Sequence, residues 1–213
     1  MVGAAIGGLL GLLWWGTGKW WPAAVAAAIV VAGDLVLTGM LHLDGLADSA
    51  DGLLPHLDPE RRLEVMRDHS VGAFGMAVGG IVILLRWAAL ESIRPSVLLL
   101  VGIWALSRGA MAVATRQVPY ARANGGIASA FLAGPRARQS ALLGGTVGFA
   151  AGVCCLTLWR LWPGLAVAGA EIVAGVCVLA FAKKRIGGFT GDVLGAVGVI
   201  SETVALVVGA ARW

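Results

Sequence analysis

The chain has 213 residues, of which 59% are hydrophobic and 13% are charged, and its net charge is +4. Soluble domains are usually about 45–50% apolar and about 25% charged, so this composition excludes a water-soluble globular domain. The cysteines, Cys154, Cys155 and Cys177, fall inside apolar runs without a CxxC pair, which indicates small hydrophobic residues and not metal ligands.

Apolar runs long enough to cross a bilayer follow one another along the sequence. A transmembrane helix needs roughly 20 mostly apolar residues. A short, glycine-rich run at 2–18 is followed by runs at 22–41, 71–90, 96–115, 141–159, 162–182 and 193–211. The apolar stretch 125–135 is too short to span and is interpreted as a re-entrant or surface segment. The sequence predicts one all-α integral membrane domain over residues 1–213, a polytopic helical bundle of about seven transmembrane helices, within a range of six to eight.

The basic residues of the loops give the orientation of this bundle. Three loops on one side of the predicted membrane, 52–70, 116–140 and 183–191, hold ten lysines and arginines, whereas the opposite loops hold four. Cytoplasmic loops carry the excess of Lys and Arg, so the three basic loops are predicted to be cytoplasmic. Eight acidic residues lie on the same side, which places the candidate active site at the cytoplasmic face.

The densest polar motif is His42-Leu-Asp44-Gly-Leu-Ala-Asp48-Ser-Ala-Asp51-Gly, directly after the 22–41 run. Asp44, Asp48 and Asp51 are spaced i, i+4, i+7, which puts them on one face of a helix. Three like charges repel, and a divalent cation such as Mg²⁺, which prefers carboxylates and phosphate oxygens, removes that penalty. The alternative is a solvated acidic helix end. His42 points away from this face and is either a base or an interfacial residue.

A second motif, Met66-Arg67-Asp68-His69-Ser70, opens the 71–90 run. Arg67 is a candidate phosphate ligand through charge-assisted hydrogen bonds. Asp68 is a candidate for the metal shell. His69 is either a general base or a polar helix-start residue, and Ser70 is a candidate N-cap.

A third motif, Lys183-Lys-Arg-Ile-Gly-Gly188-Phe-Thr190-Gly191-Asp192, is a glycine-rich turn between basic residues and the last apolar run. Backbone N–H groups at such a helix start can receive phosphate. The alternative is a basic membrane anchor beside a flexible loop.

Two carboxylates and several arginines remain near these motifs. Glu202 lies in the last apolar run and needs a partner, for which Arg108 is the obvious cation; a structural ion pair and a catalytic role are both open. Arg108, Arg116 and Tyr120 are candidates to line a polyanion-binding cleft. Three further arginines are predicted to be lipid-facing anchors: Arg122, Arg136 and Arg138. Carboxylates for metal, cations for phosphate and a glycine turn together suit phosphoryl-type transfer.

The run Leu41 to Leu53 resembles the signature of the adenosylcobinamide-GDP ribazoletransferases, also called cobalamin synthases. The resemblance continues through Met66-Arg67-Asp68 with Gly72 and Gly75, and through Gly187 to Asp192, Gly195-Ala196 and Glu202. It runs from about residue 3 to the C-terminus, with the motifs in the same order.

The resemblance implies a reaction that joins two halves of the cobalamin nucleotide loop. A ribose hydroxyl of α-ribazole, or of its 5′-phosphate, attacks the cobinamide-side phosphorus of adenosylcobinamide-GDP; GMP leaves, and adenosylcobalamin or its 5′-phosphate forms. The family requires Mg²⁺ and works at the cell inner membrane. The expected partners are these substrates, the lipid bilayer and either a second copy of the chain or other cobalamin-assembly enzymes, and no nucleic acid.

The resemblance also implies roles for individual residues. Asp44, Asp48 and Asp51 are assigned to Mg²⁺ and the pyrophosphate, Arg67 to phosphate and Asp68 to support of the metal. The general base is open among Asp51, Asp68 and His42. The remaining residues predicted to bind substrate are Arg108, Gly188, Thr190, Gly191, Asp192 and Glu202.

Two other classes of protein fit parts of the sequence. Asp44-Gly-x-Ala-Asp48-x-x-Asp51 is reminiscent of the CDP-alcohol phosphotransferases, but the remainder of their motif is missing. An ion-coupled transporter would use the intramembrane carboxylates Asp34, Glu171 and Glu202 as ion sites. The dense acidic motif lies at one interface, which favours the phosphotransferase.

Overall fold

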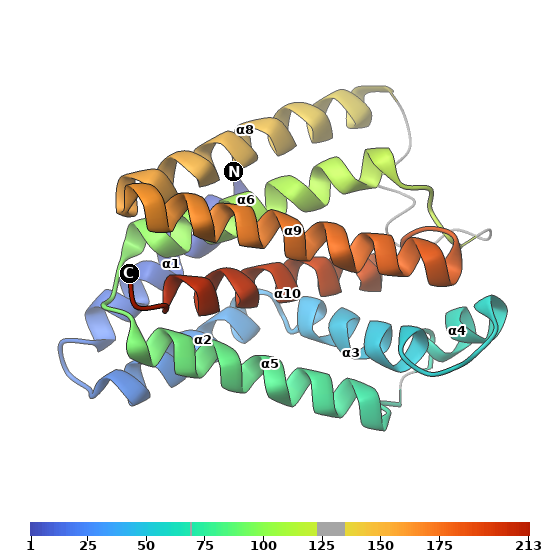
Figure 1. Ribbon diagram of the computed structural model, residues 1–213, viewed down its shortest axis with the longest axis horizontal. Helices are drawn as coiled ribbons and strands as arrows, with labels where there is room; N and C mark the ends of the chain where they lie inside the picture. The colour runs from blue at the N-terminus through green and yellow to red at the C-terminus, as the bar shows by residue number, and fades with distance from the viewer. Residues whose placement is uncertain (69, 123–134) are drawn as a thin grey trace.

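The computed structural model describes residues 1–68, 70–122 and 135–213, and the described residues form a bundle of nine helices without a strand (Figure 1). The prediction of an all-α fold is therefore confirmed. The predicted re-entrant or surface segment 125–135 lies, except for its last residue, outside the described residues. The helices are α1 (Val2–Thr17), α2 (Ala23–Leu37), α3 (Leu41–Leu53), α4 (Pro59–Val65), α5 (Ala73–Ser92), α6 (Val97–Gln117), α8 (Pro135–Trp159), α9 (Leu161–Ile186) and α10 (Gly191–Gly209).

Five of these helices are long and apolar enough to cross a membrane: α5, α6, α8, α9 and α10. Helices α2 and α3 are together long and apolar enough to make a sixth span, although they are bent by 86° relative to each other. Helix α1 is apolar but has only 16 residues. The chain is therefore a multi-pass membrane protein, with five or six spans in the described part where about seven were expected.

The predicted span 22–41 is broken, because α2 ends at Leu37 and α3 starts at Leu41. Gly39 and Met40 both adopt left-handed backbone conformations, with φ of 58° and 60°. A right-handed helix cannot continue through two such residues. The break turns the chain so that α3 packs along α10 and α5.

Helix α10 is the central element of the bundle, because it packs against α9, α3, α5 and α6 (Figure 1). Small residues allow other helices to approach closely, as membrane helices require. On α1, Gly3, Gly7 and Gly11 face α6, where an added Cβ would lie 2.1 Å from Trp104 O, 2.3 Å from Leu100 O and 2.7 Å from Val97 Cα. These three glycines allow α1 to pack closely against α6, although α1 is shorter than a usual transmembrane helix.

The described parts of the connection 54–72, which includes α4, meet the loops 118–122 and 187–190 at one end of the bundle, which we call the basic end (Figure 1). Two of these loops pair directly: Phe189 N–H donates to Pro119 O at 2.9 Å, and Ala121 N–H donates to Phe189 O at 2.9 Å. The rings of Tyr120 and Phe189 meet edge to face, with centroids 5.5 Å apart. The three predicted motifs are therefore brought to the same end.

Candidate active site

Helix α3 carries the three aspartates that were predicted to share a helix. Asp44 is exposed and Asp48 is partly buried. Asp51 is also partly buried, and both of its oxygens accept backbone hydrogen bonds, from Gly72 N–H at 2.8 Å and from Gly75 N–H at 3.0 Å. The first N–H groups of a helix have no partner within the helix, so Asp51 caps the start of α5.

The two glycines of the second motif make room for Asp51. An added Cβ at Gly72 would lie 2.4 Å from Asp51 Oδ1, and one at Gly75 would lie 2.4 Å from Asp51 Oδ2. The N-cap position of α5 is Gly72, so the prediction that Ser70 caps this helix is wrong. The capping side chain comes from α3, a long-range contact that the local sequence does not reveal.

The far end of α3 is held by a buried arginine of α4. Arg62 Nη1 donates to the carbonyls of Gly52 and Leu53, each at 2.8 Å. The last carbonyls of a helix lack partners within it, and a cation there interacts favourably with the helix dipole. Burial, with the positive charge of Arg185 adding to it, lowers the pKa of Arg62. Helix α3 is thus fixed at its C-terminal end, next to Asp51.

A fourth aspartate lies beside the α3 motif. Asp192 is the second residue of α10, and an added Cβ at Gly45 would lie 2.9 Å from its carbonyl oxygen. The carboxylate of Asp48 is repelled by the negative charges of Asp44, Asp192 and Asp51 and is attracted by the positive charge of Arg122. We call Asp44, Asp48 and Asp192 the carboxylate face. Its surplus of negative charge is a local feature of a chain whose net charge is positive.

Arg122 connects the three motifs. Its Nη2 donates to Asp192 Oδ2 at 2.7 Å and to Met66 O at 3.3 Å. It also opposes the charge of Asp48. The prediction that Arg122 is a lipid-facing anchor is therefore wrong, because this side chain turns inward to a carboxylate. The side chains of Arg136 and Arg138 lie outside the described part of the chain.

Part of the glycine-rich third motif is buried, and part of it is exposed. Gly188 is buried, and an added Cβ there would lie 2.2 Å from Pro119 O. Thr190 is fully buried; its hydroxyl accepts from Val193 N–H at 3.3 Å and donates to Asp192 Oδ2 at 3.1 Å. Gly191 is exposed, and Asp192 is partly so. Of the four residues predicted to bind nucleotide, Gly191 and Asp192 are the ones that reach the surface.

The second motif lies in the exposed connection between α4 and α5. Arg67 and Asp68 are both exposed. Asp68 Oδ1 accepts from Ser70 N–H at 3.0 Å and from Ser70 Oγ at 2.8 Å. His69, a candidate base, lies outside the described residues. Arg67 and Asp68 thus remain accessible to a ligand at the basic end.

The oxygen donors of the carboxylate face are of the kind that Mg²⁺ prefers. No three His, Cys, Asp or Glu side chains of the described residues converge closely enough to hold a metal ion by themselves. Magnesium usually keeps several waters and is held by one or two carboxylates together with substrate phosphates. Asp44 and Asp48 fit that mode of binding, in which a phosphate ligand completes the coordination.

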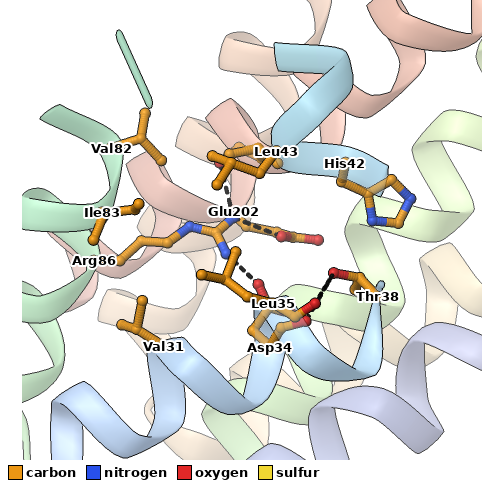
Figure 2. Close-up of a pocket in the computed structure, with 11 residues that line it drawn as sticks. Val31, Asp34, Leu35, Thr38, His42, Leu43, Val82, Ile83, Arg86 and Glu202 are labelled. Carbon is orange, nitrogen blue, oxygen red and sulfur yellow. Dashed lines mark hydrogen bonds and ion pairs between the residues drawn. The ribbon is translucent and has the colours of Figure 1, made fainter. Parts of the chain in front are cut away.

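A second polar cluster, the buried network, lies deeper in the bundle (Figure 2). Arg86 of α5 is its centre: Nη1 donates to Asp34 Oδ2 at 2.6 Å, and Nη2 donates to Glu202 Oε2 at 2.8 Å and to Val199 O at 3.0 Å. Its Nε donates to Thr203 Oγ1 at 2.8 Å. Burying an unpaired charge is costly, and here all three guanidinium nitrogens have partners.

Arg108 and Trp104 of α6 complete the network. Arg108 Nη1 pairs with Glu202 Oε1, and Trp104 Nε1 donates to Asp34 Oδ1 at 3.0 Å. The predicted pair of Arg108 and Glu202 is therefore present, and both residues are inside the bundle. His42 Nδ1 lies 3.3 Å from Arg108 Nη2. His42 faces this network and not the carboxylate face, as its helical position predicted.

The buried network argues against the transporter hypothesis. Two of the three carboxylates of that hypothesis, Asp34 and Glu202, are each paired with arginine. The third, Glu171, is buried and forms no ion pair with a described residue. The cavity that they line with His42 and Arg86 measures about 10 Å³, room for about one water molecule (Figure 2). Carboxylates that are neutralised by arginines inside so small a cavity do not form an ion pathway.

Sequence reasoning missed Arg86 and Trp104 as network residues. A signal was available in the sequence: one apolar run contains the single charge of Asp34, and another contains that of Arg86. Charged residues inside membrane spans often pair with one another. The sequence does not say which of several charges form the pair.

Comparison with known proteins gives consistent matches over the whole chain. A family model described as cobalamin-5-phosphate synthase matches residues 1–210. The chain is 37% identical over 219 residues to the adenosylcobinamide-GDP ribazoletransferase of Desulfitobacterium hafniense, which covers 97% of this chain and 82% of the relative. It is 38% identical over 217 residues to the adenosylcobinamide-GDP ribazoletransferase of Chlorobaculum tepidum, with 100% of this chain and 84% of the relative covered. No solved structure matches the chain.

Proposed function

The chain belongs to the cobalamin-5-phosphate synthase family, and we propose that it is a membrane-bound adenosylcobinamide-GDP ribazoletransferase. The family resemblance of the three motifs is thus confirmed. A ribose hydroxyl oxygen of α-ribazole, or of its 5′-phosphate, forms a bond to the cobinamide-side phosphorus of adenosylcobinamide-GDP. The bond from that phosphorus to the bridging oxygen breaks, GMP leaves, and the hydroxyl proton passes to a base. The match over nearly the whole chain does not favour a CDP-alcohol phosphotransferase or a transporter.

The observation that carries this proposal is the meeting of the three motifs around Arg122. This arginine contacts Asp192 and Met66 and opposes the charge of Asp48. Phosphoryl transfer depends mainly on positioning and on charge neutralisation, with little covalent chemistry by the protein. Carboxylates on the helices α3 and α10, with cations on the neighbouring loops, provide both.

Magnesium is proposed as the cofactor, held by Asp44 and Asp48. When bound, it neutralises the pyrophosphate and orients it for displacement. Asp192 adds its negative charge near Asp48. We do not assign it to the metal, because its Oδ2 already accepts hydrogen bonds from Arg122 and Thr190. We assign Asp51 first to the anchoring of α5, because both of its oxygens accept backbone N–H groups.

The other substrate contacts are proposed at the exposed positions of the motifs. Arg67 is assigned to phosphate, and Gly191 with Asp192 to the nucleotide at the start of α10. Asp68 is the proposed general base, because it is exposed, whereas His42 faces Arg108 and Asp51 accepts two amide hydrogen bonds. Arg108 and Glu202 are assigned to structure, because Glu202 is buried, Arg108 is mostly buried, and the two are paired with each other.

We place the protein in the cell inner membrane with the carboxylate face toward the cytoplasm. This orientation follows from the ten basic residues in the three loops, against four in the opposite loops. The described parts of these loops lie at the basic end of the bundle, where α10 with Asp192 begins (Figure 1). Nucleotide substrates would then be met from the cytoplasmic side.

The direct test is the reaction itself. The protein in lipid nanodiscs is supplied with adenosylcobinamide-GDP, α-ribazole and Mg²⁺, and cobalamin and GMP are followed by chromatography. We expect product that depends on Mg²⁺ and is lost in Asp48→Asn. Asp58→Asn, which changes an exposed aspartate just before α4, is the matched control and should keep full activity. Equal activity of both variants, or no product from folded wild-type protein, would contradict the proposal.

A further inference from the structure

A cavity on the side of the bundle away from α3 is not used by the proposed reaction. It has a volume of about 390 Å³ and lies between α6 and α9, with Phe149 of α8 and Val197 of α10 also in its wall. Helix α3, which carries the acidic motif, packs mainly against α10 and α5 and only slightly against α9. The cavity and the carboxylate face share no residue. A ligand of the cavity is therefore separate from the substrates of the face.

The cavity is a lateral groove with an apolar interior. Ala114 of α6, Val118 just after that helix, and Ile172 of α9 line it. Val176 lines it too and is 59% exposed, so the groove opens on the outer surface of the bundle. Both long helices that form it are candidate membrane spans, and the side of a span faces lipid. The groove is therefore reached from the acyl-chain region of the bilayer.

One end of the groove is polar and cationic. Lys183 and Gln117 line it at the basic end, and both are exposed. The side-chain ammonium of Lys183 makes no hydrogen bond or ion pair with any described residue, whereas the guanidinium of Arg185, two positions on, stacks over Phe181. A cation at the mouth of an apolar groove is complementary to a molecule with an anionic head and an apolar tail.

The length of the groove matches one leaflet of a bilayer. From Ile172 to Lys183 the axis of α9 advances eleven residues, which is about 16 Å at 1.5 Å per residue. The hydrocarbon core of a bilayer is about 30 Å thick, so one leaflet contributes about 15 Å. An acyl chain that starts at the headgroup level beside Lys183 would therefore end near Ile172, close to the bilayer midplane.

We propose that this groove binds one anionic phospholipid, with an acyl chain between α6 and α9 and the headgroup phosphate at Lys183. The lipid fills a space that neighbouring helices leave open, and its head lies at the same end as the carboxylate face. The site is a lipid site by length, polarity and charge, and it is independent of the reaction proposed above.

The test is native mass spectrometry of the purified protein after exchange into detergent with phosphatidylglycerol or with phosphatidylcholine. We expect one retained phosphatidylglycerol per chain and weaker retention of phosphatidylcholine. Lys183→Gln should lower the affinity for phosphatidylglycerol about fivefold, because one lysine near an anionic surface contributes about 1 kcal/mol. Lys184→Gln is the matched control, since Lys184 is equally charged and exposed but does not line the groove.

A second pair of variants tests the acyl-chain part of the site. Ala180→Phe places a ring in the groove and should abolish retention of the lipid, whereas Val173→Phe, on an exposed position of α9 outside the groove, should not. Circular dichroism confirms that both variants remain folded. Equal retention of the two lipids, an unchanged affinity in Lys183→Gln, or lipid retained in Ala180→Phe would each overturn the proposal. So would a dimer that excludes lipid from the wild-type protein, because a second copy would then occupy the groove.

Discussion

The carboxylate face and the buried network hold similar residues in opposite states. In the buried network, Asp34 and Glu202 meet Arg86 and Arg108, and the charges balance. On the carboxylate face, the three carboxylates of Asp44, Asp48 and Asp192 share one arginine, Arg122, which forms its ion pair with Asp192. An uncompensated charge deep in a bundle is costly, whereas charges near water can remain in excess until a ligand arrives. The first group therefore serves the fold, and the second is available for function.

The largest effect is expected from removing the cation at the centre of the buried network. Arg86→Met leaves Asp34 without an arginine partner and removes four hydrogen bonds, so we expect a loss of about 3–5 kcal/mol in the free energy of unfolding. Thermal unfolding in detergent measures it. Arg94→Met, at an exposed position, is the control and should be neutral. If the two variants are equally stable, the network does not contribute to folding as described.

The carboxylate face should respond in the opposite way. Asp48→Asn removes a repelled charge, so we expect a change in unfolding free energy within about 0.5 kcal/mol. The rate of product formation should fall about 100-fold or more, because a group that neutralises transition-state charge is lost. Steady-state kinetics and unfolding are measured on the same preparation. A strongly destabilised but active Asp48→Asn protein would reverse the assignment of the two regions.

The joint between α3 and α5 gives a smaller effect on stability. Gly75→Ala places a Cβ 2.4 Å from Asp51 Oδ2 and 2.9 Å from Ala47 O, so Asp51 must leave its amide partners. We expect a loss of about 1–3 kcal/mol in unfolding free energy. Gly80→Ala in the same helix meets no atom within 4 Å and should be neutral or slightly stabilising. The measurement compares the unfolding midpoints of Gly75→Ala and Gly80→Ala. Equal midpoints would show that the hydrogen bonds of Asp51 do not depend on a glycine at position 75.

The smallest effect is expected from Mg²⁺ alone. No three ligands converge among the described side chains, so Mg²⁺ alone should bind weakly. At millimolar Mg²⁺, at or below that weak dissociation constant, the unfolding free energy should rise by no more than about 0.4 kcal/mol. With adenosylcobinamide-GDP present at about 100 times its dissociation constant, the gain should reach about 2.7 kcal/mol. Differential scanning fluorimetry with and without a chelator measures both. A large shift with Mg²⁺ alone would indicate a preformed metal site.

The sequence predicted the helical membrane fold, the common end of the three motifs and the pair of Arg108 with Glu202. These features depend on apolar length, on charge in loops and on the rule that a buried charge needs a partner. The break after Leu37 was not predicted, because the apolar run continues to Leu41 and Met40 is not a residue that favours φ of 60°.

The contacts of single side chains were harder to predict. Arg122 was assigned to the lipid surface, but it turns to Asp192, which is 70 residues away in the sequence. Asp51 was read as a metal ligand with Asp44 and Asp48, because helical spacing places the three together, and it also caps α5 across a separation of 21 residues. Spacing within one helix indicates which residues share a face, and only tertiary packing decides which partner each of them meets.

The buried network also ties assembly of the bundle to complete synthesis of the chain. Asp34 precedes Arg86 by 52 residues, and Glu202 follows Arg86 by 116 residues. A nascent chain that has delivered α2 and α5 to the bilayer therefore carries a guanidinium with one of its two carboxylate partners. The second carboxylate arrives with the last helix, together with the hydroxyl of Thr203 and the carbonyl of Val199. Translation that stops before α10 yields a protein in which the two network arginines, Arg86 and Arg108, have only the carboxylate of Asp34 between them.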